Sequence, residues 1–167
     1  PVDLYTTEGF ESLLEVRDQR RPDLFELAPR LAVPVTRKVI GVKGRLDRKG
    51  RELLPLDEEA LKRGQSGAVA AIAFVNADCS PMHEKRAAEI LRWRGVESLS
   101  VSHEIAPVIR LWPRTETTVA NAYLSPVMGR FIKDLEGCLP GVPLELMTSS
   151  GQLKPAREFQ AIDSLLS

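Results

Sequence analysis

Cysteine is scarce in this 167-residue sequence, which contains only Cys79 and Cys138. Two cysteines are too few for a disulfide framework, and their spacing matches no paired metal-ligand motif, so we expect a reducing, cytoplasmic location. An excess of charge is missing too, because 23 Lys and Arg residues balance 23 Asp and Glu residues. Nucleic acids and anionic membrane surfaces attract basic proteins, so we expect neither as a partner.

Long apolar runs and targeting signals are also missing. No stretch of about 18 apolar residues occurs, which argues against a membrane-spanning helix. The start of the chain lacks a charged segment followed by an apolar one, so it does not predict a secretory signal. The first residue is Pro1 rather than Met. We therefore expect the chain to begin after processing, inside a longer gene or at an artificial cut.

The motifs of a complete catalytic site are missing as well. The sequence contains no Gly-x-x-x-x-Gly-Lys-Ser/Thr loop, no Gly-x-Gly-x-x-Gly loop and no Gly-x-Ser-x-Gly elbow. Two His-Glu pairs occur, at residues 83–84 and 103–104, and Cys79 stands four residues before His83, but this spacing matches no strong metal signature. We therefore expect neither a metal nor a cofactor to be held within this chain alone.

The composition that remains is that of one globular domain, with 43% hydrophobic and 28% charged residues. In residues 1–36 the spacing of apolar side chains predicts a helix near residues 10–17, followed by a proline-containing connector. Residues 37–56 predict a β-hairpin that turns at residues 47–50, Asp-Arg-Lys-Gly.

Residues 57–167 predict an alternation of strands and helices. A short helix starts at Asp57, and the apolar run at residues 68–75 predicts a strand buried on both faces. The expected elements that follow are a helix over 80–94, a strand over 98–102, a helix over 117–136 kinked or divided at Pro126, and a third strand over 143–147. This order predicts right-handed βαβ crossovers, and hence a single α/β domain with a small, mostly parallel sheet and the hairpin as a side element.

Ligands of open α/β sheets tend to sit beyond the carboxyl ends of the strands. Three polar segments follow the predicted strands there, at residues 76–80, 102–104 and 148–152. Ordinary loops and helix caps are the alternative interpretation of such segments. Residues 114–118 precede the predicted long helix, where hydroxyls and an arginine could bind an anion or simply cap the helix.

A family likeness is carried by six segments. They are residues 6–25 (Thr-Thr-Glu-Gly-Phe continuing to Arg-Arg-Pro-Asp-Leu-Phe), 54–58 (Leu-Pro-Leu-Asp-Glu), 71–84 (a strand, then Pro-Met-His-Glu), 114–124 (Arg-Thr-Glu-Thr-Thr-Val, then Asn-Ala-Tyr-Leu), 147–151 (Met-Thr-Ser-Ser-Gly) and 165–167 (Leu-Leu-Ser). Each segment is weak alone, but their order and spacing agree across nearly the whole chain. Together they resemble the hydantoinase A/5-oxoprolinase family.

The departures from the family pattern fall at polar positions. Residues 76–80 (Asn-Ala-Asp-Cys-Ser) stand where the family has His, Ser, Tyr, a variable residue and Asn. Thr148, Ser150 and Gln152 replace Gln, Asn and Gly, and Pro113 replaces the usual Glu. The likeness therefore supports the fold more than any one substrate, and a divergent member with altered or lost activity is an open alternative.

The resemblance implies that the chain is an interior piece of an actin-like ATPase-type subunit. Such a subunit would hydrolyse a cyclic amide with ATP and Mg²⁺, by phosphorylating the amide oxygen so that water can attack the ring carbonyl. The family's phosphate loops would lie before Pro1 and after Ser167, so the piece alone would be inactive. The implied partners are the rest of its own subunit, a second (B-type) subunit and the small cyclic amide.

The catalytic residues are not identified by the resemblance. The side chains expected to contact substrate or a neighbouring lobe are Asn76, His83, Arg114, Thr118, Asn121, Ser149 and Ser150. The alternative functions are an assembly or substrate-binding lobe of a related acetone or acetophenone carboxylase subunit, and a non-catalytic divergent homologue.

Overall fold

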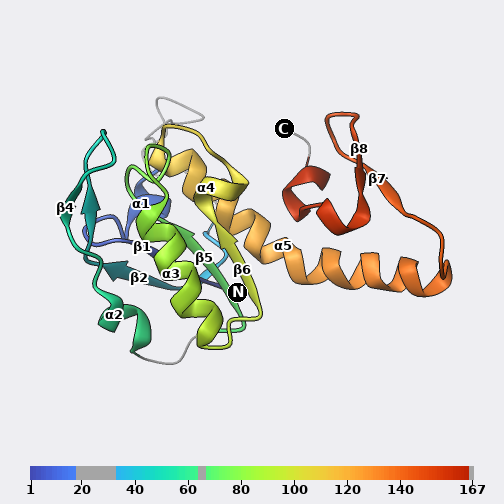
Figure 1. Cartoon of the computed structure of the whole chain (residues 1–167), viewed down its shortest axis with the longest axis horizontal. Coiled ribbons are helices and arrows are strands. Elements are labelled where there is room, and N and C mark those ends of the chain that lie inside the picture. Colours follow the sequence, from blue (N-terminus) through green and yellow to red (C-terminus); the bar gives the residue numbers. More distant parts are fainter. Residues whose placement is uncertain (18–32, 64–66, 166–167) are drawn as a thin grey trace.

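Four parallel strands form the central sheet of the computed structural model, which describes residues 1–17, 33–63 and 67–165. The strands are β1 (Val2–Thr7), β2 (Thr36–Val42), β5 (Val69–Ala73) and β6 (Ser98–Val101), in the spatial order β2-β1-β5-β6 (Figure 1). All three neighbouring pairs are parallel, and Tyr5 of β1 lies opposite both Ile40 and Ile72. The predicted α/β class with a small parallel sheet is confirmed.

Each face of the sheet is covered by one helix, because alternate strand residues point to opposite sides. Tyr5 and Ile72 pack in one core with residues of α3 (Met82–Trp93). Leu4 and Ala71 pack in the other core with residues of α5 (Leu111–Cys138). The fully apolar pattern of residues 68–75 is explained by this burial on both faces.

Strand β1 is the main element that the sequence analysis missed. All six of its residues are buried, and it lies inside the sheet between β2 and β5. The predicted helix of the first segment is only one turn long, α1 (Leu13–Val16), and follows β1. The connector expected around Pro22 and Pro29, the family-like residues 19–25, the short link at 64–66, and Leu166 and Ser167 lie outside the described residues.

The predicted hairpin over residues 37–56 is only partly correct. Residues 36–42 belong to β2 and pair with β1 instead. The antiparallel pair consists of β3 (Arg45–Leu46) and β4 (Glu52–Leu54), which flank the predicted turn. A short helix, α2 (Glu58–Lys62), follows, and the Asp57 side chain caps it by accepting a hydrogen bond from the Ala60 amide at 3.1 Å.

Two further corrections concern the second half of the chain. Helix α5 starts at Leu111, six residues earlier than predicted, and continues through Pro126 as one 28-residue element. The predicted third parallel strand is instead β7 (Glu145–Met147), which pairs antiparallel with β8 (Leu153–Pro155) in a separate sheet. Local pattern identifies a strand there but cannot identify its pairing partner, which is why this prediction was wrong.

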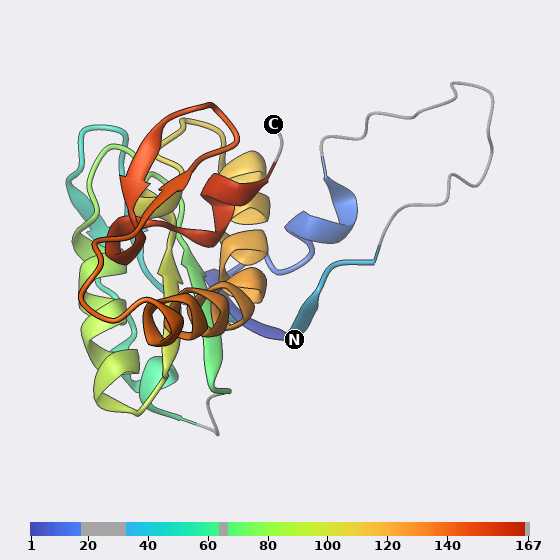
Figure 2. The same ribbon diagram turned by 90° about the vertical axis from the view of Figure 1, so that its right-hand side faces the viewer.

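The remaining elements are short. Helix α4 (Ser102–Ile105) follows β6 directly, and two 3₁₀ helices, η1 (Ala156–Glu158) and η2 (Ala161–Ser164), follow β8. The second half of α5 projects from the sheet domain and carries β7, β8 and the 3₁₀ helices (Figure 1). Figure 2 views the molecule from the side of this projecting part, with β7 and β8 near the viewer.

Candidate functional site

The carboxyl ends of the parallel strands lie at one edge of the sheet and carry a buried polar cluster. The Thr7 hydroxyl, at the end of β1, accepts a hydrogen bond from the Val75 amide at 3.0 Å. Two of the three polar segments predicted to meet here, residues 76–80 and 102–104, do follow neighbouring strands at this edge. The third, residues 148–152, joins β7 to β8 and belongs to the separate sheet, so the prediction that it lies at this edge was wrong.

Glu84 is the centre of this cluster. Its side chain is fully buried in the first turn of α3. One carboxylate oxygen accepts hydrogen bonds from the Phe74 amide at 2.8 Å and the Ser102 hydroxyl at 2.6 Å. The other accepts from the backbone amide and ring Nδ1 of His103, at 3.0 and 2.8 Å. Glu84 therefore holds together the ends of β5 and β6, where charge-assisted hydrogen bonds are strong.

His103 is oriented by this carboxylate. Because an ionised carboxylate can only accept, the ring donates from Nδ1, which leaves Nε2 as an acceptor. The His103 side chain is 13% exposed, and Nε2 lies 3.8 Å from a carboxylate oxygen of Glu104. An imidazole held in this way can accept a hydrogen bond or a proton from a bound molecule.

His83 faces a different part of the molecule. Its Nε2 lies 2.7 Å from a carboxylate oxygen of Glu52, so the ring ties α3 to strand β4. The ring also packs against Gly44, where an added Cβ would lie 3.2 Å from His83 Nδ1. The described geometry gives His83 a role in fixing the β3–β4 hairpin, and its contact with substrate or another lobe stays a prediction.

Arg114 is fully buried and links α5 to the loop after β5. Its Nη1 donates to Asp78 Oδ1 at 2.7 Å and to the Val108 carbonyl at 3.0 Å, while Nη2 donates to the Phe74 carbonyl at 2.6 Å. Partial burial opposes ionisation of Asp78, but the hydrogen bond and charge of Arg114 outweigh it and lower the pKa of that carboxyl. The pair keeps the loop against the helix with both groups charged.

Asn76 adopts a left-handed backbone conformation, with φ of 60°, directly beyond β5. Asn tolerates this conformation better than most residues, and its Nδ2 donates to the Leu46 carbonyl at 2.7 Å. It borders a hollow of about 240 Å³ that is lined by Arg48, Asn76, Asp78, Cys79 and Ile109. This hollow is the candidate ligand site of the chain.

Cys79 also lines the hollow. Desolvation and the neighbouring Asp78 carboxylate raise the pKa of its thiol. A raised pKa disfavours the thiolate, which is the nucleophilic form of cysteine. The thiol of Cys79 is therefore a weaker nucleophile than one without a carboxylate beside it.

Thr118 and Asn121 lie inside the body of the molecule. The Thr118 hydroxyl donates to the Arg114 carbonyl at 2.6 Å within the helix. Asn121 donates from Nδ2 to the Ser100 hydroxyl at 2.9 Å and accepts at Oδ1 from the Ile162 amide at 2.9 Å. Because α5 begins at Leu111, residues 114–118 are already within the helix, and the predicted anion site at a helix start there was wrong.

Ser149 and Ser150 lie in the loop between β7 and β8. The Ser150 hydroxyl lies 2.9 Å from the Thr148 hydroxyl. The Ser149 amide donates to the Asp163 carbonyl at 2.7 Å, and its hydroxyl donates to the Leu165 carbonyl. These bonds join the β7–β8 loop to η2, and the predicted ligand contacts of both serines stay untested by this geometry.

Sequence reasoning left Glu84 out of the candidate site residues, whereas Asp78 and Ser102 lie in two of the polar segments predicted at this edge. An acid in the first turn of a helix also has a common structural role as a partner of the helix dipole. The signal that could have identified it is the pattern of a buried strand followed by a short helix with an acid in its first turn. The partners of Glu84 come from 10 to 19 residues away along the chain, so spacing alone could not identify them.

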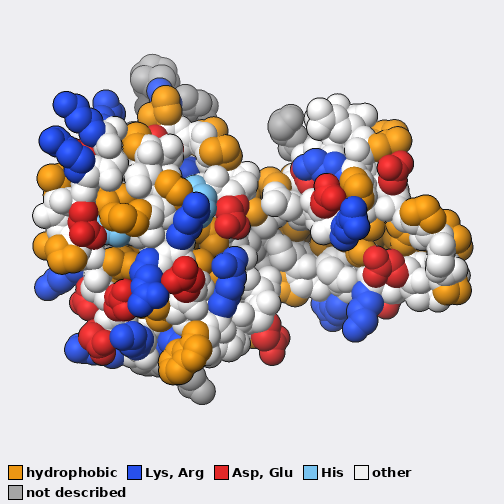
Figure 3. Space-filling model, in the orientation of Figure 1, with side chains coloured by type: hydrophobic (Ala, Val, Ile, Leu, Met, Phe, Trp, Pro, Cys, Tyr) orange, Lys and Arg blue, Asp and Glu red, His pale blue; other side chains and the backbone are white. Residues whose placement is uncertain are grey.

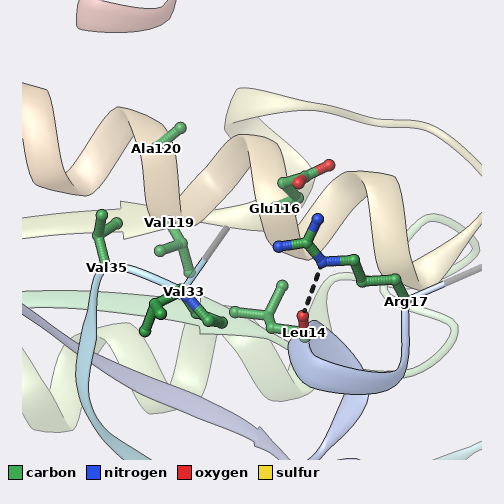
Figure 4. Close-up of a pocket in the computed structure, with 8 residues that line it drawn as sticks. Leu14, Arg17, Val33, Val35, Glu116, Val119 and Ala120 are labelled. Atoms are coloured by element: carbon green, nitrogen blue, oxygen red, sulfur yellow. Dashed lines mark hydrogen bonds between the residues drawn. The ribbon is translucent and has the colours of Figure 1, made fainter. Parts of the chain in front are cut away.

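A second hollow, of about 170 Å³, lies between α1, the chain before β2 and α5 (Figure 4). Its lining is mainly aliphatic, with Leu14, Val33, Val35 and Val119 pointing into it. Arg17 and Val33 both line this hollow. They flank residues 18–32, which lie outside the described part of the chain. We therefore assign no ligand to it.

Within residues 1–17, 33–63 and 67–165, no group of three or more His, Cys, Asp or Glu side chains is placed to hold a metal ion. The sequence also lacks the glycine-rich loops that cradle phosphates. In the same part of the chain, none of the helices has the length and apolar character needed to cross a membrane.

Comparison with known proteins identifies similar sequences. The profile described as "Hydantoinase/oxoprolinase N-terminal region" matches residues 1–95. The chain is 38% identical to "Caprolactamase subunit alpha" of Pseudomonas jessenii over 96% of this chain and 23% of that protein. It is 28% identical to "5-oxoprolinase" of Saccharomyces cerevisiae over 97% of this chain and 15% of that protein. The chain therefore spans less than a quarter of either relative.

Solved structures of larger proteins contain the same fold. The crystal structure of the ATP-dependent caprolactamase from Pseudomonas jessenii matches with a TM-score of 0.79 and 32% identity, over 98% of this chain and 26% of that chain. The nucleotide-free structure of an acetone carboxylase matches with a TM-score of 0.74 and 15% identity, over 99% of this chain and 27% of that chain. At that identity, the second likeness concerns the fold alone.

Proposed function

The chain belongs to the hydantoinase/oxoprolinase family, whose N-terminal region matches residues 1–95, and we propose that it is one lobe of an ATP-dependent cyclic-amide hydrolase. The observation that carries this proposal is the likeness to the caprolactamase alpha subunit, which extends over 96% of the chain at 38% identity. The likeness to 5-oxoprolinase supports the same class, because caprolactam and 5-oxoproline are both cyclic amides.

The hollow at the carboxyl edge of the sheet is the part of this chain that would contact the cyclic amide. Arg48 and Asn76 line it, and a guanidinium can donate to an amide oxygen while a side-chain amide oxygen can accept from an amide N–H. Cyclic amides of this size present one such oxygen and one such N–H. Ile109 supplies an apolar wall for the ring carbons.

The chemistry that ATP supplies when bound is activation of the ring amide, whose oxygen would be phosphorylated so that water can attack the carbon and open the ring. In this proposal the nucleotide and Mg²⁺ are held by the actin-like remainder of the subunit, because this sequence has no glycine-rich loop of the kind that cradles phosphates. The role of this chain is to position the amide and the loops at the sheet edge. The isolated 167-residue chain would therefore not hydrolyse ATP.

The whole enzyme would include a second, B-type subunit. This inference is supported by the name of the Pseudomonas relative, which is a subunit alpha. A cytoplasmic location is consistent with two free cysteines, Cys79 and Cys138, both exposed.

Two other functions remain candidates with their own observations. A carboxylase lobe has the fold that this chain shares with acetone carboxylase, a likeness that at 15% identity concerns the fold alone. A non-catalytic homologue is favoured by the departures at residues 76–80. Replacing Asn76 with His in the whole protein restores the residue that the family has at this position. A gain of lactam turnover in an otherwise inactive protein would then support the interpretation as a non-catalytic homologue.

The test is phosphate release by the whole subunit with its partner subunit. ATP would be supplied with caprolactam, 5-oxoproline or hydantoin, and separately with acetone and bicarbonate. Faster release with a cyclic amide supports the proposal, and faster release only with acetone and bicarbonate supports the carboxylase. Phosphate release that no cyclic amide accelerates contradicts the proposal.

A further inference from the structure

The tip of the β3–β4 hairpin is strongly basic. Residues 43–51 contain five Lys and Arg residues and one acid, Asp47, although the whole chain has no net charge. Figure 3 shows Lys and Arg side chains gathered over this tip, at the upper left. The Asp47 carboxylate is already engaged, because it accepts hydrogen bonds from the Arg51 side chain and from the backbone amides of Lys49 and Arg51, each at 2.8 Å. It therefore offers no free charge to its neighbours.

Arg48 is the cation of this tip that lines the hollow. The tip packs against the loop after β5, since a Cβ added to Gly50 would lie 2.9 Å from the Ser80 Cβ. Burial and the Asp78 carboxylate raise the pKa of the Cys79 thiol, and the charge of Arg48 opposes them, so the guanidinium is close to that thiol. Among the residues that the structure describes, Arg48 has no ion-pair partner. Its N–H donors are therefore available to a ligand.

The other charges that line the hollow cancel. Asp78 lies 2.7 Å from the fully buried Arg114, so this pair contributes no net charge. The Cys79 thiol stays neutral near pH 7, because its pKa is raised. Asn76 and Ile109 complete the lining and carry no charge. The lining therefore keeps one unpaired positive charge, which favours an anionic ligand.

We propose that Arg48 is a specificity-determining residue that selects cyclic amides with a carboxylate on the ring. A guanidinium binds a carboxylate through two parallel hydrogen bonds, and such charge-assisted bonds are roughly twice as strong as neutral ones. The carboxylate therefore outcompetes the amide oxygen for Arg48. Asn76 donates from Nδ2 to the Leu46 carbonyl, so its Oδ1 is left to accept from the ring N–H. The amide oxygen is then free for phosphoryl transfer.

This inference rests on the proposed function and divides its substrates into two groups. 5-Oxoproline carries a carboxylate beside the ring nitrogen, whereas caprolactam carries none. The chain is 38% identical to the caprolactamase alpha subunit and 28% identical to the yeast 5-oxoprolinase, so sequence likeness alone favours the neutral lactam. The unpaired charge at the hollow favours the acid instead.

Binding to the whole subunit tests the inference without turnover. Isothermal titration calorimetry would compare 5-oxoproline with 2-pyrrolidinone, which is the same ring without the carboxylate. A hydrogen-bonded charge pair predicts that 2-pyrrolidinone binds at least about tenfold more weakly. Arg48→Met should weaken binding of 5-oxoproline by about the same factor and change that of 2-pyrrolidinone by less than about threefold. Equal affinities in the native protein, or no detectable binding of 5-oxoproline, contradict the inference.

Lys49→Met provides the matched control. It removes a positive charge from the same hairpin tip but leaves the lining of the hollow intact. The affinity for 5-oxoproline should change by less than about threefold, because salt screens a charge that makes no contact. A loss as large as that of Arg48→Met would assign the selection to the general charge of the tip and would overturn the inference. Weaker ATP binding by Arg48→Met, with unchanged 5-oxoproline binding, would assign the guanidinium to a nucleotide phosphate and would also overturn it.

Turnover with ATP separates this inference from the proposed function. Binding of 5-oxoproline that depends on Arg48, without ring opening, contradicts the proposed function and supports the inference. Ring opening of 2-pyrrolidinone with the same kcat/KM as 5-oxoproline supports the proposed function and contradicts the inference.

Discussion

Arg114 Nη1 lies 2.7 Å from Asp78 Oδ1, while Nη2 of the same guanidinium donates to the Phe74 carbonyl at 2.6 Å. One buried cation therefore fixes the start and the middle of the loop that joins β5 to α3. That loop forms one wall of the candidate site, because Asn76, Asp78 and Cys79 all line the hollow. The stability of the fold and the shape of the site depend on the same contact.

Arg114→Met should destabilise the fold strongly. It leaves Asp78 without its cation, and the Phe74 carbonyl keeps only the Ala77 amide, at 3.4 Å. Removing one partner of a buried ion pair costs about 3–5 kcal/mol. The measurement is the free energy of unfolding from urea denaturation followed by circular dichroism. Arg130→Met on the exposed part of α5 is the matched control, with an expected change within about 0.5 kcal/mol. Equal stability of the two variants would contradict the assigned role of Arg114.

Asp78→Asn should change how stability depends on pH. The pKa of Asp78 is lowered in the folded protein, so its contribution is fully present above the pKa of the unfolded chain and is lost as pH falls through the lower, folded value. The difference in unfolding free energy between the native protein and the variant should therefore be largest near neutral pH. It should shrink as the pH falls below about 4. A difference that stays constant from pH 7 to pH 3 would be inconsistent with this ion pair.

Glu84→Gln should lower the free energy of unfolding by more than is usual for an exchange of two side chains of similar size and shape. Glu84 accepts four hydrogen bonds, whereas Gln has one acceptor oxygen and would turn an NH₂ group toward donors. The expected loss is about 3 kcal/mol, since charged buried groups lose more than the usual 1–3 kcal/mol. Glu89→Gln on the same helix, with a side chain 64% exposed, should be neutral. Matching urea midpoints for both variants would count against this role.

Asn76 can be examined with two substitutions that separate backbone from side chain. Asn76→Ala loses both the bond to the Leu46 carbonyl and the tolerance of positive φ, and should cost about 1–2 kcal/mol. Asn76→Gly keeps the conformational freedom and should cost less. In the whole enzyme both variants should raise the KM for the cyclic amide, because both remove the side-chain amide from the hollow. An unchanged KM in both would place substrate elsewhere.

The sequence predicted the fold where a signal is local. The run at residues 68–75 identified a buried strand, and the helix predicted over 80–94 begins within two residues of the start of α3 at Met82. The pairing of strands was harder, because β1 pairs with β2 and β5, which lie more than 30 and 60 residues away in sequence. A strand predicted at residues 143–147 was real, but nothing local shows that its partner is β8 rather than the main sheet.

In the candidate site, too, local features could be predicted from the sequence, whereas contacts between distant elements could not. Its location beyond β5 and β6 followed from the general behaviour of parallel sheets, and Asn76 was included for that reason. The internal roles of His83 and Asn121 were not foreseen, because each depends on a partner in a distant element. Glu84 and His103 likewise come together only once α3 and β6 pack side by side.

The ratio of ATP consumed to rings opened by the whole enzyme tests the central claim most directly. Inorganic phosphate and the ring-opened amino acid would be quantified in the same reaction with caprolactam or 5-oxoproline. If the amide oxygen is phosphorylated in each turnover, the two products should appear together, in a ratio of about one. Ring opening at full rate without ATP, or ATP hydrolysis that never accompanies ring opening, would contradict the assignment of this chain to an ATP-dependent cyclic-amide hydrolase.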